Sequence, residues 1–172
     1  MTATHHFSVT LSKEGRWKDA VNIDKAVLGI RERVLGESHP DTIHKARTLA
    51  LTYSKQGQWK KAEEVEVRTT EMSRRALGEE HSDTLGAIGN LAVTYSKQGR
   101  WRKAEELEVK VIVSRRMVGE EHEDTLDVTG NLAATHREQG RLKEADDLHV
   151  KVIDASRRVL DAEHPGHNQG DR

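Results

Sequence analysis

Histidine is the residue type that most directly suggests chemistry in this chain, because ten histidines occur among 172 residues and imidazole is a common metal ligand. His5 and His6 are adjacent and could form a metal site. Four others recur at regular intervals in the same local segment: His39, His81, His122 and His164. A residue that returns at the period of a structural module usually has a structural role. We therefore expect these four to bond helix ends, and we predict no metal site.

Carboxylate pairs are the second candidate for chemistry. Glu63–Glu64 and Glu105–Glu106 occupy equivalent positions beside lysines, and we expect them to lie in solvent on the outer face of a helix. The EEHEDT segment at 120–125 lacks the second histidine of a zinc-protease helix. The sequence shows no glycine-rich phosphate loop, no Ser/His/Asp set above background and no cysteine. We predict no catalytic residue, no metal and no cofactor, and hence no enzyme.

Nucleic-acid and membrane partners are disfavoured by composition. The formal net charge is −1, so no overall field attracts an anionic polymer or surface. We expect the three tryptophans, which share one repeat position, to pack in a core rather than to stack on bases: Trp17, Trp59 and Trp101. No segment approaches the ~18 apolar residues of a membrane span, and residues 1–15 contain no apolar signal region. These features predict a soluble, cytoplasmic protein.

The chain consists of internal repeats. The segment YSKQGQWKKAEE from Tyr53 returns as YSKQGRWRKAEE from Tyr95, at an offset of 42 residues. Related segments begin at Ser12 (SKEGRWKDA) and, at an offset of 41, at Arg137 (REQGRLKEA). A second block recurs in step with the first, as LGESHPDT, LGEEHSDT, VGEEHEDT and LDAEHPG. Two interleaved blocks with a shared period indicate repeated supersecondary units.

Apolar residues recur at spacings of three and four, for example Leu142, Ala145, Leu148 and Val152, which is the pattern of an amphipathic helix. The spacing predicts one set of helices at 2–14, 42–56, 84–98 and 125–139. A second set is predicted at 17–35, 59–77, 101–118 and 142–160. Residues 161–172 show no periodicity and are expected to fray.

Glycine, aspartate and proline mark the expected helix ends. Left-handed C-cap conformations are predicted at Gly57, Gly99 and Gly140, and similarly at Gly36, Gly78 and Gly119. Side-chain N-caps are predicted at Asp41, Asp83 and Asp124. Pro40 is expected to stop the chain from continuing as helix before the first of these caps.

One residue is missing from the third repeat after Ile112, where the 42-residue offset becomes 41. Deleting a residue inside a helix rotates the following side chains by about 100°. Either the helix ends early and the loop absorbs the change, which we favour, or the packing angle between repeats three and four is altered.

The segments NLAVTYSKQGRWRKAEEL (Asn90–Leu107) and GEEHEDT (Gly119–Thr125) resemble the tetratricopeptide repeat family in its 42-residue, kinesin-light-chain-like form. Similar arrays occur in NB-ARC-type signalling ATPases of fungi and bacteria. The resemblance implies an all-α, right-handed superhelical solenoid of four helix–turn–helix repeats. The array would cover 1–165, with repeats at about 1–41, 42–83, 84–124 and 125–165 and a disordered tail at 166–172.

In this family the first helices of the repeats line a concave groove. The resemblance places the groove here at His44, Arg47, Leu51, Ser54, Lys55, Asn90, Val93, Ser96, Lys97, Asn131, Ala134 and Arg137. An asparagine such as Asn90 or Asn131 can satisfy both the donor and the acceptor of an extended peptide backbone. The hypothesis is a non-catalytic scaffold that binds an extended protein segment with acidic residues near Arg47, Lys55 and Lys97. Alternatively, the lysines are merely solvated and the asparagines brace neighbouring helices.

A second functional hypothesis concerns the ends of the array. Each repeat buries a face against the next, so terminal repeats normally need a polar cap. Here the sequence offers no evident cap, and Val152 and Ile153 are expected to be partly exposed. The chain would then be a fragment of a larger protein, or a structural and self-assembly module of a signalling ATPase that forms homo-oligomers through its repeat ends.

Overall fold

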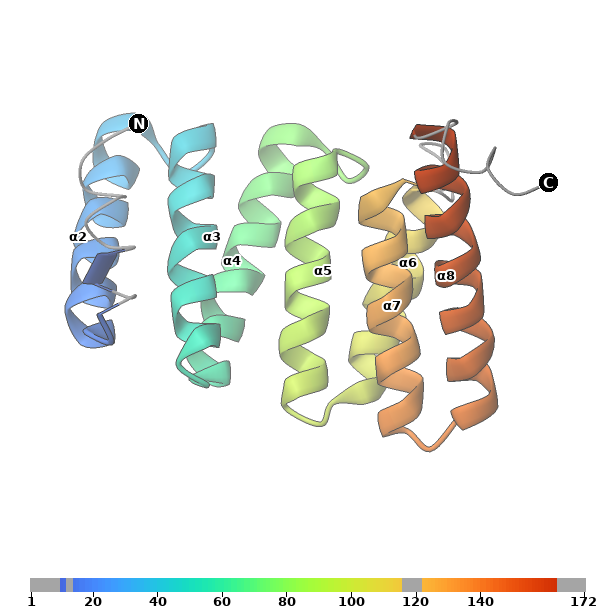
Figure 1. Ribbon diagram of the computed structural model, residues 1–172. Helices are drawn as coiled ribbons and strands as arrows, with labels where there is room; N and C mark the ends of the chain where they lie inside the picture. The colour runs from blue at the N-terminus through green and yellow to red at the C-terminus, as the bar shows by residue number, and fades with distance from the viewer. Residues whose placement is uncertain (1–9, 12–13, 116–121, 164–172) are drawn as a thin grey trace. The chain divides into compact units, whose positions relative to one another are not determined.

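The computed structural model describes residues 10–11, 14–115 and 122–163, with side chains described as far as residue 159. All regular structure in these ranges is helical, and the chain forms two compact units, Met1–Gln98 and Gly99–Arg172 (Figure 1). The first unit contains α2 (Trp17–Leu35), α3 (Pro40–Lys55), α4 (Trp59–Leu77) and α5 (Ser82–Lys97). The second contains α6 (Trp101–Arg115), α7 (Glu123–Glu138) and α8 (Leu142–Glu163). None of the described helices is both long enough and apolar enough to cross a membrane.

The predicted helices are confirmed wherever the chain is described. α2 and α4 have the predicted bounds, whereas α3, α5 and α7 begin two residues before the predicted start. α8 continues to Glu163, so the expectation that fraying begins at residue 161 was wrong. The helix expected at 2–14 is described only in part, and Thr10 and Leu11 are helical. The His5–His6 pair, His164, the consequence of the deletion after Ile112 and the tail at 166–172 fall outside the described residues.

The helix N-caps are histidines, not the predicted aspartates. The Nδ1 atoms of His39, His81 and His122 accept hydrogen bonds from the backbone N–H groups two residues later, at 3.1, 3.1 and 3.3 Å. The recurrent histidines therefore bond helix ends, as predicted. The aspartates follow in the first helical turn, where a carboxylate complements the helix dipole. Pro40 is the first residue of α3 rather than a stop signal, because this position needs no backbone N–H.

Glycines close both kinds of helix, but in two different conformations. Gly57 (φ 69°), Gly99 (φ 74°) and Gly140 (φ 78°) follow the first helix of a repeat with the predicted positive φ. Gly36 and Gly78 also have positive φ, at 88° and 95°, but their ψ values of 161° and 166° are extended rather than left-handed helical. That region is essentially restricted to glycine. The predicted cap at Gly119 lies outside the described residues.

The core of the first unit lies where α3 packs against α2 and α4 and where α5 packs against α4. It contains Val21, Leu28, Ala46, Leu49, Tyr53 and Ala62. In the second unit, α7 packs against α6 and α8. An alanine with no exposed surface recurs near the start of every second-type helix: Ala20, Ala62, Ala104 and Ala145. Its small side chain lets the neighbouring helix approach closely, which is how an aromatic-poor sequence forms a dense interior.

Candidate functional site

The predicted peptide surface of the first unit lies on α3 and α5, which both pack against α4 (Figure 1). On α3, His44 and Lys55 are exposed, Leu51 is 53% exposed, and Arg47 and Ser54 are half-buried. On α5, Asn90 and Lys97 are exposed, whereas Val93 and Ser96 are half-buried. An exposed leucine between polar neighbours offers apolar contact area to a partner.

Arg47 connects the two helices of this surface. Its Nη1 donates a hydrogen bond of 2.9 Å to Asp83 Oδ1 at the start of α5. A Cβ atom at Gly86 would lie 3.5 Å from Arg47 Nη2, an ordinary van der Waals distance, so this ion pair does not depend on glycine there. The guanidinium is therefore already neutralised, and an acidic partner would have to compete with Asp83 for it.

Lys55, Lys97 and Asn90 make no side-chain hydrogen bond or ion pair within the described part of the chain. Both lysines lie at the C-terminal ends of their helices, where a cation complements the helix dipole. Asn90 has no side-chain bond to a neighbouring helix in the described ranges. Its amide therefore keeps one acceptor and two donor positions for a ligand.

The remaining three predicted residues lie on α7 in the second unit. Asn131 is half-buried, and Ala134 and Arg137 are exposed. Arg137 Nη2 lies 3.9 Å from Asp146 Oδ1, and both side chains are mostly solvent-exposed. A pair of this kind contributes little to stability, so it would yield to another anion at small cost.

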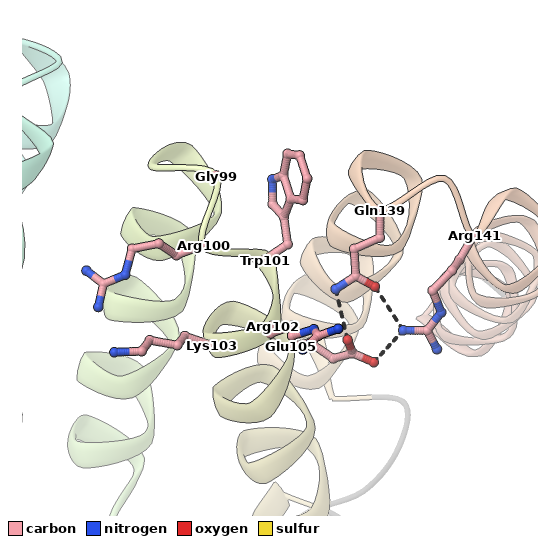
Figure 2. A pocket seen from close by; sticks show the side chains of 8 residues that line it. All are labelled: Gly99, Arg100, Trp101, Arg102, Lys103, Glu105, Gln139 and Arg141. Carbon is pink, nitrogen blue, oxygen red and sulfur yellow. Dashed lines mark hydrogen bonds and ion pairs between the residues drawn. The ribbon is translucent and has the colours of Figure 1, made fainter.

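The tryptophans are half-buried rather than part of the core, so this prediction was wrong. Each lies at the start of a second-type helix and lines a surface hollow. The hollow beside Trp101 has a volume of about 740 Å³ and is also lined by Arg102, Glu105, Gln139 and Arg141. Figure 2 shows the indole at its rim, directed away from the polar cluster.

Glu105 is half-buried at the centre of a polar network, so the prediction that it lies in solvent was wrong. Its Oε1 accepts from Arg141 Nη1 at 2.6 Å, and its Oε2 accepts from Gln139 at 2.9 Å (Figure 2). Oε1 also lies 3.2 Å from His136 Nε2. Burial raises the pKa of Glu105, but the hydrogen bonds from Arg141 and Gln139 outweigh it, and the net pKa is below the ordinary value. Glu63 of α4 is likewise half-buried and accepts a 2.9 Å bond from Gln98. Glu64 and Glu106 are exposed, as predicted.

Replacing Glu105 with alanine should destabilise the second unit by about 1–2 kcal/mol, because Gln139 and the buried His136 lose an acceptor. The matched control is Glu106→Ala, which removes an exposed carboxylate one residue away and should change stability by less than about 0.5 kcal/mol. Urea unfolding at pH 7 measures both. Equal losses for the two variants would show that the network contributes nothing.

A series of buried acids was not predicted from the sequence. Asp24, Glu66 and Glu108 lie at one repeat position on α2, α4 and α6, and are 0%, 6% and 1% exposed. Asp24 is paired through Oδ1 with the ammonium of Lys45, which is 3% exposed, and Thr52 Oγ1 lies 3.4 Å from its Oδ2. The Thr52 hydroxyl has one hydrogen and also lies 3.0 Å from the backbone oxygen of Thr48, so Lys45 is the main partner of the Asp24 carboxylate.

Glu66 and Glu108 have a threonine partner but no cation partner among the described residues. Thr94 on α5 bonds Glu66, and Thr135 Oγ1 on α7 lies 3.2 Å from Glu108 Oε1. The second oxygen of each carboxyl has no hydrogen-bond partner in the described residues. Burial raises the pKa of each to about 7, with repulsion from Glu63 and Glu105 respectively adding to the rise.

The offset of 42 residues could have revealed these acids, because it brings them into one column of the repeat alignment. The residues on either side of them are aliphatic, apart from Lys25, so the apolar pattern alone does not show which acid points inwards. No group of three or more His, Cys, Asp or Glu that could hold a metal occurs in the described ranges. Each buried acid is isolated from the others, and its threonine joins one repeat to the next.

Comparison with known proteins gives the family. Two family models, both described as tetratricopeptide repeat, match residues 1–74 and residues 84–124 and 125–166. No curated protein sequence matches.

Two crystal structures of nearly identical TPR-like repeats, from a kinesin light chain candidate of Podosopora anserina, share 25% identity with this chain and TM-scores of 0.81 and 0.80. The alignments cover 95% of this chain and 77% and 78% of theirs. BtubC (BKLC) from P. vanneervenii, at 18% identity, has a TM-score of 0.79 over 96% of this chain and 65% of its own, which supports the fold alone.

These repeats generally mediate protein–protein interaction, and kinesin-light-chain-like repeat folds are typically non-catalytic scaffolds. The matched segments cover most of the chain, and the helices observed in both units agree with the repeat pattern. The chain belongs to the tetratricopeptide repeat family and has an all-α, kinesin-light-chain-like repeat fold.

Proposed function

We propose that this protein is a non-catalytic scaffold that binds an extended, acidic protein segment through the first-type helices. The single observation that carries the proposal is a strip on α3 and α5. There the exposed Leu51 and the half-buried Val93 offer apolar contact beside Lys55 and Lys97, two cations with no side-chain partner in the described ranges. Exposed ion pairs contribute only about 0–1 kcal/mol each. Apolar contact and backbone bonds to Asn90 would therefore supply most of the affinity, and the lysines the charge preference.

Reversing both charges, with Lys55→Glu and Lys97→Glu, should weaken binding of acidic peptides at least about tenfold, since each lost attraction becomes a repulsion. Fluorescence polarisation with a labelled library of extended acidic peptides and their amidated, neutral counterparts measures this. The control is Lys60→Glu with Arg102→Glu, which has the same change in net charge on exposed residues of second-type helices. Equal weakening by both double variants would contradict a specific surface.

Self-assembly is the alternative, and exposed apolar side chains on α8 favour it. Ile153 is 49% exposed and Val152 is half-buried, in line with the expectation that both are partly exposed, and Val150 is exposed as well. The same variants separate the two functions when they are examined by size-exclusion chromatography with light scattering. A scaffold keeps its mass when Lys55 and Lys97 are reversed. Dispersal of an oligomer by that double variant would instead favour self-assembly through the α3–α5 strip.

A further inference from the structure

The three buried acids occupy one structural position but differ in their surroundings. In the first repeat, the carboxylate of Asp24 forms an ion pair with Lys45. The residues at the position of Lys45 in the following repeats are Ala87 and Val128, which are buried and carry no charge. Within the residues that the structure describes, Glu66 and Glu108 are thus buried carboxyl groups at repeat interfaces without a counter-charge.

An ionised carboxylate is costly at such a position. Taking a charge out of water requires a partner charge or a full set of donors, and a buried oxygen without a donor adds its own desolvation penalty. Each of the two glutamates has one threonine donor and one oxygen without a partner in the described part of the chain. The neutral, protonated form has no such charge to compensate.

In the described part of the chain, the helices packed against Glu66 supply no buried cation that is free to pair with it. α3 contributes two buried titratable side chains, Lys45, which is held by Asp24, and Tyr53. On α4 itself Glu63 adds negative charge. The titratable residues of α5 are not buried: Asp83, Tyr95 and Lys97.

Glu108 is in an equivalent position in the second unit. Glu105 is one turn earlier on α6 and adds negative charge. On α7, the one buried titratable side chain is His136, which faces Glu105. Arg115 of α6 is committed to Asp124 at 2.6 Å.

We propose that Glu66 and Glu108 are proton-binding positions, and that proton uptake there tightens the packing of α4 on α5 and of α6 on α7 near neutral pH. The sign follows from linkage. The pKa of each glutamate is about 7 in the folded chain, against the ordinary value of 4.5. Between these values the folded state holds the proton and the unfolded state does not. Stability is therefore greatest at the acidic end of this window, falls as pH rises through it, and levels off above pH 7 to 8.

The consequence for partner binding rests on the proposed function. α5 carries Asn90, Val93 and Lys97, and Thr94, the partner of Glu66, lies between them. Looser packing of α5 on α4 at higher pH would disturb the placement of these three side chains. A partner would then bind more tightly at mildly acidic pH than at alkaline pH.

The test compares the full chain with Glu66→Gln, Glu108→Gln and the double variant by urea unfolding between pH 5.5 and 8.5. Glutamine keeps the size and hydrogen-bonding capacity of the protonated acid. In the unmodified chain, each carboxyl should lower the folding equilibrium constant about tenfold or more as the pH rises from 5.5 to 8.5. Each single glutamine variant should lack the part of this decrease that its carboxyl causes. The double variant should lack the contributions of both carboxyls, leaving only those of other groups. Glu106→Gln, an exposed neighbour, should leave the pH profile unchanged.

A direct titration keeps the proposal testable even if a variant fails to fold. Carbon-13 NMR of glutamate carboxyls follows Glu66 and Glu108 individually in the unmodified protein. Two carboxyls that titrate near neutrality support the proposal. It is overturned if every glutamate titrates below about pH 5, the ordinary range of the group, or if the double glutamine variant retains the full pH dependence of unfolding. Neither measurement uses a peptide, so their outcome is independent of the proposed binding function.

Discussion

Replacement of Lys45 with methionine is expected to destabilise the protein by about 3–5 kcal/mol, the cost of leaving a buried charge without its partner. Asp24 has no exposed surface, and Lys45 is the only cation paired with it in the described residues. Thr52 Oγ1, at 3.4 Å, cannot replace a full charge. Urea unfolding at pH 7, followed by circular dichroism, measures the loss.

Lys55→Met is the matched control, because it is the same change on the same helix at an exposed residue. It should alter stability by less than about 0.5 kcal/mol. A second control is the pair Asp24→Leu with Lys45→Met, which removes both charges and should recover most of the loss, since an apolar pair often replaces a buried ion pair at no cost. If Lys45→Met costs no more than Lys55→Met, the pair does not stabilise the fold.

The repeat pattern predicted the helices well, because it contains several independent kinds of information. Two blocks recur together, and a glycine follows every predicted helix except the last, so the start of α4 at Trp59 and its end at Leu77 were both predicted. The starts of α3 and α5 were missed by two residues. Aspartate is a common N-cap and histidine is not, but the Nδ1 of His39 or His81 reaches the backbone N–H two residues later in the same way as an Asp side-chain oxygen.

Burial along the second-type helices could not be predicted from hydrophobicity. On α4 the buried residues are Ala62, Glu66, Thr69, Thr70, Met72 and Ser73, most of them small or polar. Val67, by contrast, is 47% exposed, and Val109 and Val113 on α6 are also exposed. Periodicity does give the spacing of the inward positions. The residue type at each inward position depends on its partner in the next repeat, as Glu66 depends on Thr94. Such partners can be identified only once the packing of the helices is known.

Some features of the candidate site were likewise predictable from the sequence, and others were not. The helix faces of Leu51, Lys55, Asn90 and Lys97 follow from the repeat register, and the structure finds all four exposed. The bond between Arg47 and Asp83 was not predictable, because it joins residues from successive repeats. The network around Glu105 was missed for the same reason, since its donors lie on or beyond the next helix.

Ile88→Ala should destabilise the protein by about 2–5 kcal/mol, the range for removing a large buried aliphatic side chain. Ile88 is 1% exposed and is among the largest fully buried side chains of the described residues. It lies on α5, which packs against α4, and the truncation would leave a cavity that the neighbouring helix cannot close without moving. Thermal or urea unfolding gives the loss.

Leu51→Ala is the informative counterpart, because the same type of truncation falls on the predicted binding surface. Leu51 is 53% exposed, so its loss should cost less than about 1 kcal/mol of stability. If α3 and α5 bind an acidic segment, the same variant should weaken peptide binding several-fold, since Leu51 would be covered in the complex. Ile88→Ala would then lower mainly the stability of the fold, and Leu51→Ala mainly the affinity for the peptide. A Leu51→Ala variant that unfolds as easily as Ile88→Ala would place Leu51 in the core. One that retains full peptide affinity would move the binding surface away from α3.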